Sequence, residues 1–310
     1  MSRLYSNVTL LGDSILCRGY ENGDQVSFKE IIKPTLFVPS PKGKWKSLTG
    51  ESMTPVKQDG AKRAREFLEK YKDVDNFEVH GYERFVYQWI SEKYPGQLRF
   101  NMSDMKIITI DIEVACENGF PNPEQAIEPL LSITVKNHQN KKFVVWGVGE
   151  FNNTRDDVTY IECENEKHLI QEFLVFWENH LPDVITGWNT EFFDIPYLCN
   201  RIKNLCGEDE IKRLSPWRNV FSRDIYQMGR KHEVYDIQGI SHLDYFDLYR
   251  KFTYTNQESY RLDHIAYVEL GEKKDENPYE IFREWYTKDF QSFIEYNIMD
   301  VEIVDKLEDK

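Results

Sequence analysis

A strongly alternating stretch, Lys106–Val114 (KIITIDIEV), restricts the fold of this chain more than any other segment. Its β-branched residues predict a strand, and side chains two apart on a strand point to the same face. The apolar residues then face a core, while Asp111 and Glu113 project together from the opposite face. Adjacent carboxylates repel each other unless a cation lies between them, and oxygen ligands suit Mg²⁺ or Mn²⁺. The pair is therefore a candidate metal site; the alternative is a solvated strand face with two incidental acids.

The elements after this strand indicate an α/β domain. Pattern and composition predict two further strands, a helix, a short buried strand, a second helix ended by Gly207, a hairpin and a mainly helical stretch of 60 residues. These elements are expected at Leu130–Lys136, Lys142–Val148, Glu164–His180, Asp183–Trp188, Phe193–Cys206 and Val234–Asp244, with the helical stretch last. Strands first, then helices alternating with strands, indicate a sandwich built on a mixed sheet.

The first hundred residues differ in character and predict a separate, small α+β domain. Short strands with a turn at Glu21–Asp24 are expected over residues 1–40, and a loop rich in Pro, Gly, Lys and Ser over 41–60. A helix is predicted at Ala61–Tyr71, followed by more strand-like sequence to about Phe100. The polar join Asn101–Lys106 then suggests domains of 1–103 and 104–310.

Composition and charge exclude several classes of protein. Aromatic residues reach 14% of the 310 residues, too many for a disordered chain, and no apolar run approaches the roughly 20 residues of a membrane span. Five cysteines without a CxxC pair predict reduced thiols in the cytoplasm rather than a zinc site. A net charge of −14 argues against a broad basic groove for nucleic acid. A local contact through metal ions stays compatible with it.

Asp194 is a second candidate, within ITGWNTEFFDIPYL. Trp188 and Asn189 end a strand, and Pro196 falls in the first turn of the next helix, where proline is tolerated. Asp194 then lies at or near the N-cap, at the edge where open α/β sheets place their sites. The alternative of equal weight is a simple helix cap.

Tyr296 and Asp300 form a third candidate group, within FIEYNIMDVEIV. Residues four apart share a face of a helix. The aspartate can be a further metal ligand, and the phenol can hydrogen-bond a metal-bound water. The alternative is a surface pair, or a core tyrosine whose hydroxyl has a partner.

Taken together, these segments resemble the three exonuclease motifs of family B DNA polymerases, particularly those of T-even-type bacteriophages. The resemblance rests on the motifs DIEV, FP (Phe120-Pro121), TGWN–x–E–x–FD–x–PY, LDY–x–DLY–x–KF (Leu243–Phe252) and YNI–x–DVE. It is strong from about residue 106 onward and weaker before residue 100.

The resemblance implies a ribonuclease H-like exonuclease domain with a mixed sheet, beside an N-terminal domain. It implies two divalent cations, Mg²⁺ or Mn²⁺, held by four carboxylates, with a tyrosine that orients water and two residues near the DNA end. Carried over by motif, the ligands are Asp111, Glu113, Asp194 and Asp300, the water-orienting residue is Tyr296, and the residues near the DNA end are Phe120 and Asn189. The family also places a lysine near the site. Lys273 and Lys274 are candidates, but Glu276 falls at the aligned position, so the role is left unassigned.

The implied function is proofreading by a replicative DNA polymerase: hydrolysis at a DNA 3′ end, single-stranded or frayed, releasing 5′-mononucleotides. No SLYPS-like or DTDS-like polymerase motif is found. A polymerase domain is therefore expected in cis, if the chain is truncated, or in trans, if the gene is split. The alternative is a non-catalytic nucleic-acid-binding module whose N-terminal domain binds RNA. A loose group of basic residues at 41–65 favours it, although a solvated loop and helix face explains the group better.

Overall fold

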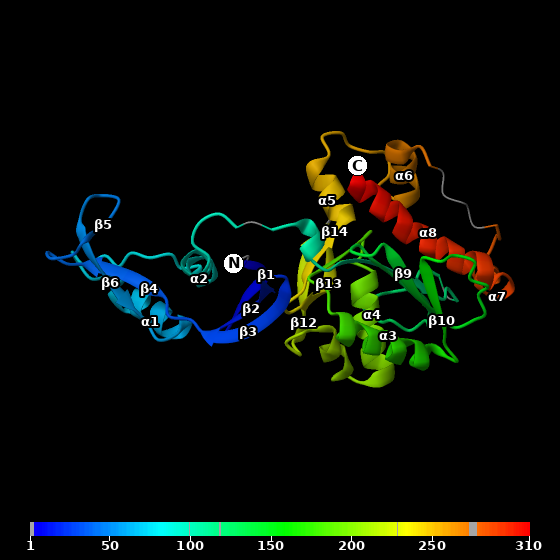
Figure 1. Cartoon of the computed structure of the whole chain (residues 1–310), viewed down its shortest axis with the longest axis horizontal. Coiled ribbons are helices and arrows are strands. Elements are labelled where there is room, and N and C mark those ends of the chain that lie inside the picture. Colours follow the sequence, from blue (N-terminus) through cyan, green and yellow to red (C-terminus); the bar gives the residue numbers. More distant parts are fainter. Residues whose placement is uncertain (1–2, 99, 118, 228, 273–277) are drawn as a thin grey trace. The chain divides into compact units, whose positions relative to one another are not determined.

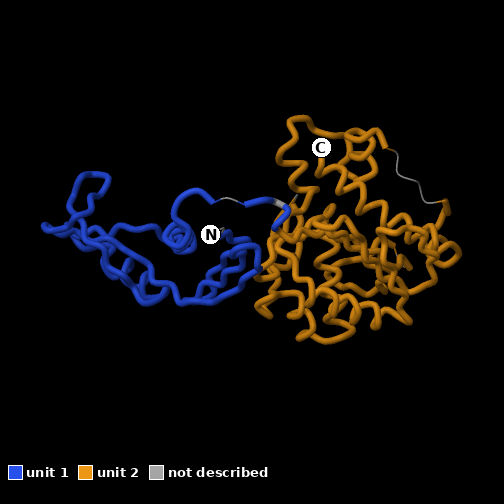
Figure 2. The backbone as a smooth tube through the Cα atoms, in the orientation of Figure 1, with its two compact units in different colours: residues 1–104 blue, residues 105–310 orange. Residues whose placement is uncertain are grey.

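The computed structural model describes residues 3–98, 100–117, 119–227, 229–272 and 278–310. The chain forms two compact units, 1–104 and 105–310, coloured separately in Figure 2. A short 3₁₀ turn, Met102–Asp104, lies in the polar join between them. Among the described residues, no helix combines the length and the apolar character needed to cross a membrane.

The first unit contains two small antiparallel sheets. One has the order β1 (Arg3–Leu11), β2 (Ser14–Glu21), β3 (Asp24–Ile31). The other has the order β4 (Thr35–Pro39), β6 (Ser52–Lys57), β5 (Trp45–Lys46). Helix α1 spans Ala61–Tyr71, as predicted.

Two predictions for this unit were wrong. Residues 41–60 are not all loop, because β5 and β6 form there. Pro55 lies beyond the part of β6 that β5 covers, an edge position where a strand tolerates proline. The strand-like sequence before residue 100 instead contains helix α2 (Phe85–Lys93). Phe85 and Trp89, one helical turn apart, are both buried in the core, so packing outweighs the strand propensity of the segment.

The second unit is built on a sheet of six strands. The sheet is mixed, as the sequence predicted. The order is β10 (Val158–Glu162), β9 (Lys142–Gly147), β8 (Leu130–Asn137), β7 (Ile107–Val114), β11 (Val184–Gly187), β14 (Ser241–Asp244). Strand β8 is antiparallel to both of its neighbours, and the other adjacent pairs are parallel. Strand β7 is therefore central.

Helices cover both faces of this sheet, as Figure 1 shows. Helices α3 (Glu166–His180) and α4 (Asp194–Cys206) pack on the face to which Ile110 and Ile112 point. On the other face, α7 (Phe282–Lys288) and α8 (Phe290–Asp309) pack against apolar residues of β8 and β9. The face of β7 that carries the acids is consequently covered by α8 rather than left to solvent.

The predicted hairpin at Val234–Asp244 was misplaced. The hairpin consists of β12 (Val220–Gln227) and β13 (Arg230–Ile237), with Gly229 at a φ of 74° in its connection. The turn-like residues Asp236–Gly239 instead lead from β13 into β14, which belongs to the main sheet. Helices α5 (Tyr245–Phe252) and α6 (Leu262–Leu270) precede α7 and α8, so the C-terminal part is mainly helical, as predicted.

Candidate active site

Three of the predicted carboxylates meet between β7 and α8. Asp111 and Glu113 on β7 and Asp300 on α8 each offer an oxygen, and these oxygens all lie within 4.8 Å of one another. Asp300 is buried, and the other two are half-buried. Repulsion between three carboxylates this close favours binding of a cation, and their hard oxygens suit Mg²⁺ or Mn²⁺.

Asp194, the fourth predicted carboxylate, is buried at the start of α4. It does not cap the helix: Phe193 is the N-cap, and no side-chain cap bond forms. Instead, Oδ1 of Asp194 accepts a hydrogen bond from the backbone N–H of Ile112 at 3.0 Å. The pKa of Asp194 is raised to about 7. Burial is the main cause; the carboxylates of Asp244 and Asp300 also raise the pKa, and the hydrogen bond from Ile112 partly offsets them. Asp194 therefore interacts electrostatically with Asp300, although it lies outside the group of three.

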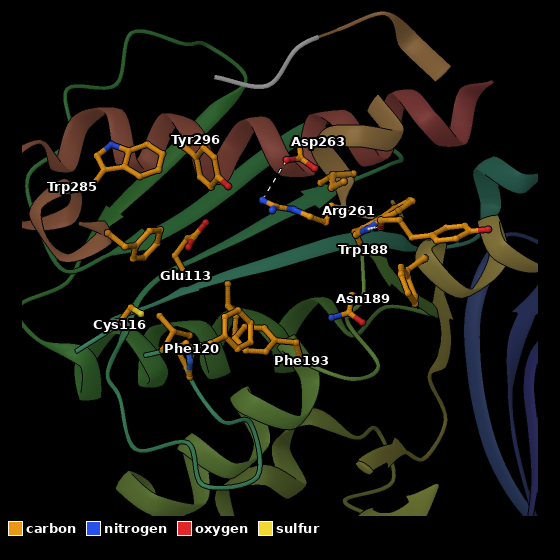
Figure 3. A pocket seen from close by; sticks show the side chains of 17 residues that line it. Glu113, Cys116, Phe120, Trp188, Asn189, Phe193, Arg261, Asp263, Trp285 and Tyr296 are labelled. Carbon is orange, nitrogen blue, oxygen red and sulfur yellow. Dashed lines mark hydrogen bonds and ion pairs between the residues drawn. The ribbon is translucent and has the colours of Figure 1, made fainter. Parts of the chain in front are cut away.

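Tyr296 lies one turn before Asp300 on α8, and its ring packs against Trp285 with centroids 4.7 Å apart. Tyr296 and Glu113 point into the same cavity in Figure 3. Burial raises the pKa of the Tyr296 phenol far above its usual range, and the carboxylates of Asp300, Glu113 and Asp111 raise it further. The phenol thus stays protonated and can donate a hydrogen bond, while its ring serves the core.

A cavity of about 1210 Å³ opens beside the carboxylates, and aromatic rings form much of its wall. Phe120 is 85% exposed there, with its ring 5.3 Å from that of Phe193. Asn189, at a left-handed φ of 64°, also contributes to the wall. The structure therefore places both residues predicted near a DNA end in this cavity. Its aromatic lining consists of Phe120, Trp188, Phe193, Phe246, Tyr260, Phe282, Trp285 and Tyr296.

A buried carboxylate that the sequence analysis did not single out holds this wall in place. Asp244 accepts hydrogen bonds at 2.9 Å from the backbone N–H groups of Asn189, Glu191 and Phe246. The pKa of Asp244 is raised to about 6, because the effect of burial exceeds the opposite effect of these three donors. Asp244 lies within the motif LDY–x–DLY, but its hydrogen-bond partners come from segments that only the three-dimensional fold brings to it.

Of the described residues that line the cavity, Arg261 is the one that carries a permanent positive charge. It pairs with Asp263, which also lines the cavity, at 3.4 Å (Figure 3). The candidate lysines Lys273 and Lys274 lie outside the described residues. The sequence offered no signal for Arg261, which lies in none of the recognised motifs.

A second group of possible ligands, His138, Asp305 and Glu308, lies at the C-terminal end of α8. Asp305 already forms ion pairs with the ammonium groups of Lys136 and Lys141. Because two lysines already neutralise Asp305, we interpret this group as an ionic contact between α8 and the β8–β9 segment rather than as a metal site.

Comparison with known proteins identifies the family. Residues 80–265 match the family model for the exonuclease domain of DNA polymerase family B. The chain is 33% identical to the DNA-directed DNA polymerase of Escherichia phage RB69 and 30% identical to that of Enterobacteria phage T4, over 97% and 99% of its length. It is 26% identical over 58% of its length to a DNA polymerase catalytic subunit of Alcelaphine herpesvirus 1, whose sequence it covers to 18%. The chain spans about a third of the phage polymerases, 36% and 37% of their lengths. The chain belongs to DNA polymerase family B and carries the exonuclease domain of that family.

Proposed function

We propose that this chain is the 3′→5′ proofreading exonuclease part of a replicative DNA polymerase, with residues 104–310 as a ribonuclease H-like exonuclease domain and residues 1–103 as the N-terminal domain. The observation that carries the proposal is the meeting of Asp111, Glu113 and Asp300 within 4.8 Å beside an aromatic cavity, in a chain of this family. The sheet order supports the fold, with β8 antiparallel to both neighbours.

The donor set fits divalent cations of the Mg²⁺ or Mn²⁺ type, because every candidate ligand is a carboxylate oxygen. Asp111, Glu113 and Asp300 would hold one cation, and Asp111 with Asp194 the other. When bound, two such ions would offset the negative charge that develops on the attacking and leaving oxygens during phosphodiester hydrolysis.

The remaining side chains position the reactants. Tyr296 donates its phenolic hydrogen to the attacking water, since burial and the carboxylates around it raise the pKa of the phenol and keep it protonated. Phe120 offers an exposed ring on which a base can stack, and Asn189 lies on the same wall. A mispaired primer end frays at little cost, and stacking on aromatic rings binds single strands without regard to sequence. The cavity therefore favours frayed 3′ ends.

Two partners follow from this assignment. The substrate is a single-stranded or frayed DNA 3′ end, and a polymerase domain acts with this chain, in cis or in trans. RNA binding by the N-terminal domain is a weaker proposal. It rests on the basic residues of 41–65, where Lys62 and Arg63 already lie near Glu66 and Asp59 at 3.9 and 3.6 Å. A module without catalysis is not favoured, because it would not need the converging carboxylates.

Digestion of a 5′-labelled single-stranded oligonucleotide tests the proposal. With Mg²⁺ we expect progressive shortening from the 3′ end and release of 5′-mononucleotides, which stop when a chelator is added. Asp111→Ala should abolish the activity. Glu295→Ala, which removes an exposed carboxylate from α8, should retain it. Near-normal turnover of Asp111→Ala would contradict the assignment.

A further inference from the structure

Asn297 joins the strands of the sheet to the carboxylate cluster. It is fully buried on α8, and its Nδ2 donates a hydrogen bond to Oδ2 of Asp111 at 2.5 Å. Its Oδ1 accepts hydrogen bonds from the hydroxyls of Ser132 and Thr134 on β8, the latter at 2.5 Å. Among the candidate ligands, this network reaches Asp111.

The two hydroxyls occupy register positions opposite the acids. Thr134 pairs with Asp111 and Ser132 pairs with Glu113 across the β7–β8 ladder. Residues opposite each other in a ladder project from the same face, so β8 places two buried hydroxyls beneath the carboxylates. Asn297 lies between these hydroxyls and Asp111.

The two ends of the Asn297 amide have different partners. A side-chain amide has one accepting oxygen and one donating nitrogen. Both hydroxyls donate to Oδ1, and Nδ2 faces the carboxylate of Asp111. This hydrogen bond occupies Oδ2 of Asp111 and fixes the orientation of the carboxylate.

We propose that Asn297 is a positioning residue that holds the carboxylate of Asp111 oriented for a divalent cation. It acts through Asp111 and contacts no DNA. Asp300 follows Asn297 by three residues, so one turn of α8 supplies both a candidate ligand and the group that orients another. The inference rests on the proposed metal-dependent function.

Titration with Mn²⁺, followed by calorimetry, tests the inference in the full chain. Asn297→Leu keeps a similar volume and removes the donor. We expect its Kd for Mn²⁺ to rise tenfold or more, as is usual when a group that orients a ligand is lost. The Mn²⁺ concentration for half-maximal digestion should rise in parallel.

Two further variants separate positioning from damage to the core. The triple variant Ser132→Ala, Thr134→Val, Asn297→Leu removes the amide together with both hydroxyls that donate to it, so no hydroxyl loses its acceptor. It should therefore melt close to the wild type and still bind Mn²⁺ weakly. The pair Ser132→Ala, Thr134→Val should weaken binding less than Asn297→Leu. Adding Asn297→Leu to this pair should give no greater loss than Asn297→Leu alone, because the hydroxyls act through the amide.

A folded triple variant that binds Mn²⁺ within twofold of the wild type would overturn the inference. So would independent, multiplying effects of the hydroxyl pair and of Asn297→Leu. If the wild type binds Mn²⁺ in an Asn297-dependent manner but digests no DNA, the proposed function fails while the positioning role stands. If the wild type binds no Mn²⁺ at all, both are wrong.

Discussion

The carboxylate of Asp194 accepts a hydrogen bond from the backbone N–H of Ile112 at 3.0 Å, across 82 positions of the chain. Ile112 lies between the two acids of β7, and the pairing of β11 with β7 ends earlier, at Thr109. The carboxylate thus satisfies a backbone group that β11 does not reach. Asp194 therefore has a structural task besides its proposed metal-binding one, and two substitutions can separate them.

Asp194→Asn keeps an acceptor for the Ile112 N–H but removes the charge. We expect it to melt close to the wild type and to lose exonuclease activity. Asp194→Ala leaves the buried N–H without its acceptor, which typically costs about 1–3 kcal/mol, so it should lose both stability and activity. Urea unfolding and oligonucleotide digestion of both variants check this. An active Asp194→Asn would remove Asp194 from the metal site.

Metal binding should be visible in thermal stability. A cation that binds only the folded state stabilises it by about 2.7 kcal/mol when present at one hundred times its Kd. Mg²⁺ or Mn²⁺ should therefore raise the melting temperature of the wild type by several degrees. Asp111→Ala combined with Asp300→Ala should abolish this response, and Glu295→Ala should preserve it. An equal response of the double variant would show that the ions bind elsewhere.

Local patterns predicted the parts of the fold that depend on local geometry. The period of two on β7 predicted that Asp111 and Glu113 share a face, and both are half-buried there, opposite a buried apolar row. Asp236–Gly239 carries turn residues, but such residues serve hairpins and connections between sheets equally well, so the hairpin was misplaced. Only the pairing of β7 with β8 brings Thr134 opposite Asp111. The spacing of residues along the chain does not predict this register.

Acid should destabilise the protein partly through His242 on β14. The pKa of His242 is lowered to about 4, because the effect of burial exceeds the opposite effect of the nearby Asp236. Nε2 of His242 lies 2.8 Å from the hydroxyl of Thr190. An unfolded histidine has a pKa near 6.5. As the pH falls from about 6.5 to 4, the unfolded state therefore takes up a proton that the folded state resists, and stability is lost.

His242→Gln cannot be protonated in this range. The difference in unfolding free energy between the wild type and this variant should shift against the wild type by roughly 2 kcal/mol from pH 7 to pH 4.5, at about 1.4 kcal/mol per pKa unit. Urea unfolding at several pH values measures the shift. Parallel pH profiles for the two proteins would contradict the assignment.

Tyr296→Phe separates the two tasks of this side chain. It removes the phenolic hydroxyl and leaves the ring packed against Trp285. Loss of a hydrogen bond felt mainly in the transition state commonly costs roughly 2–4 kcal/mol, or tens to about a thousandfold in rate. The defect should appear in single-turnover digestion and hardly at all in DNA affinity. Thermal melting of the same preparation should be nearly unchanged, because the ring remains in the core.

A purely structural tyrosine predicts the reverse: altered melting, with activity reduced only by the unfolded fraction. An unchanged single-turnover rate would remove Tyr296 from the catalytic residues and leave the carboxylates in place.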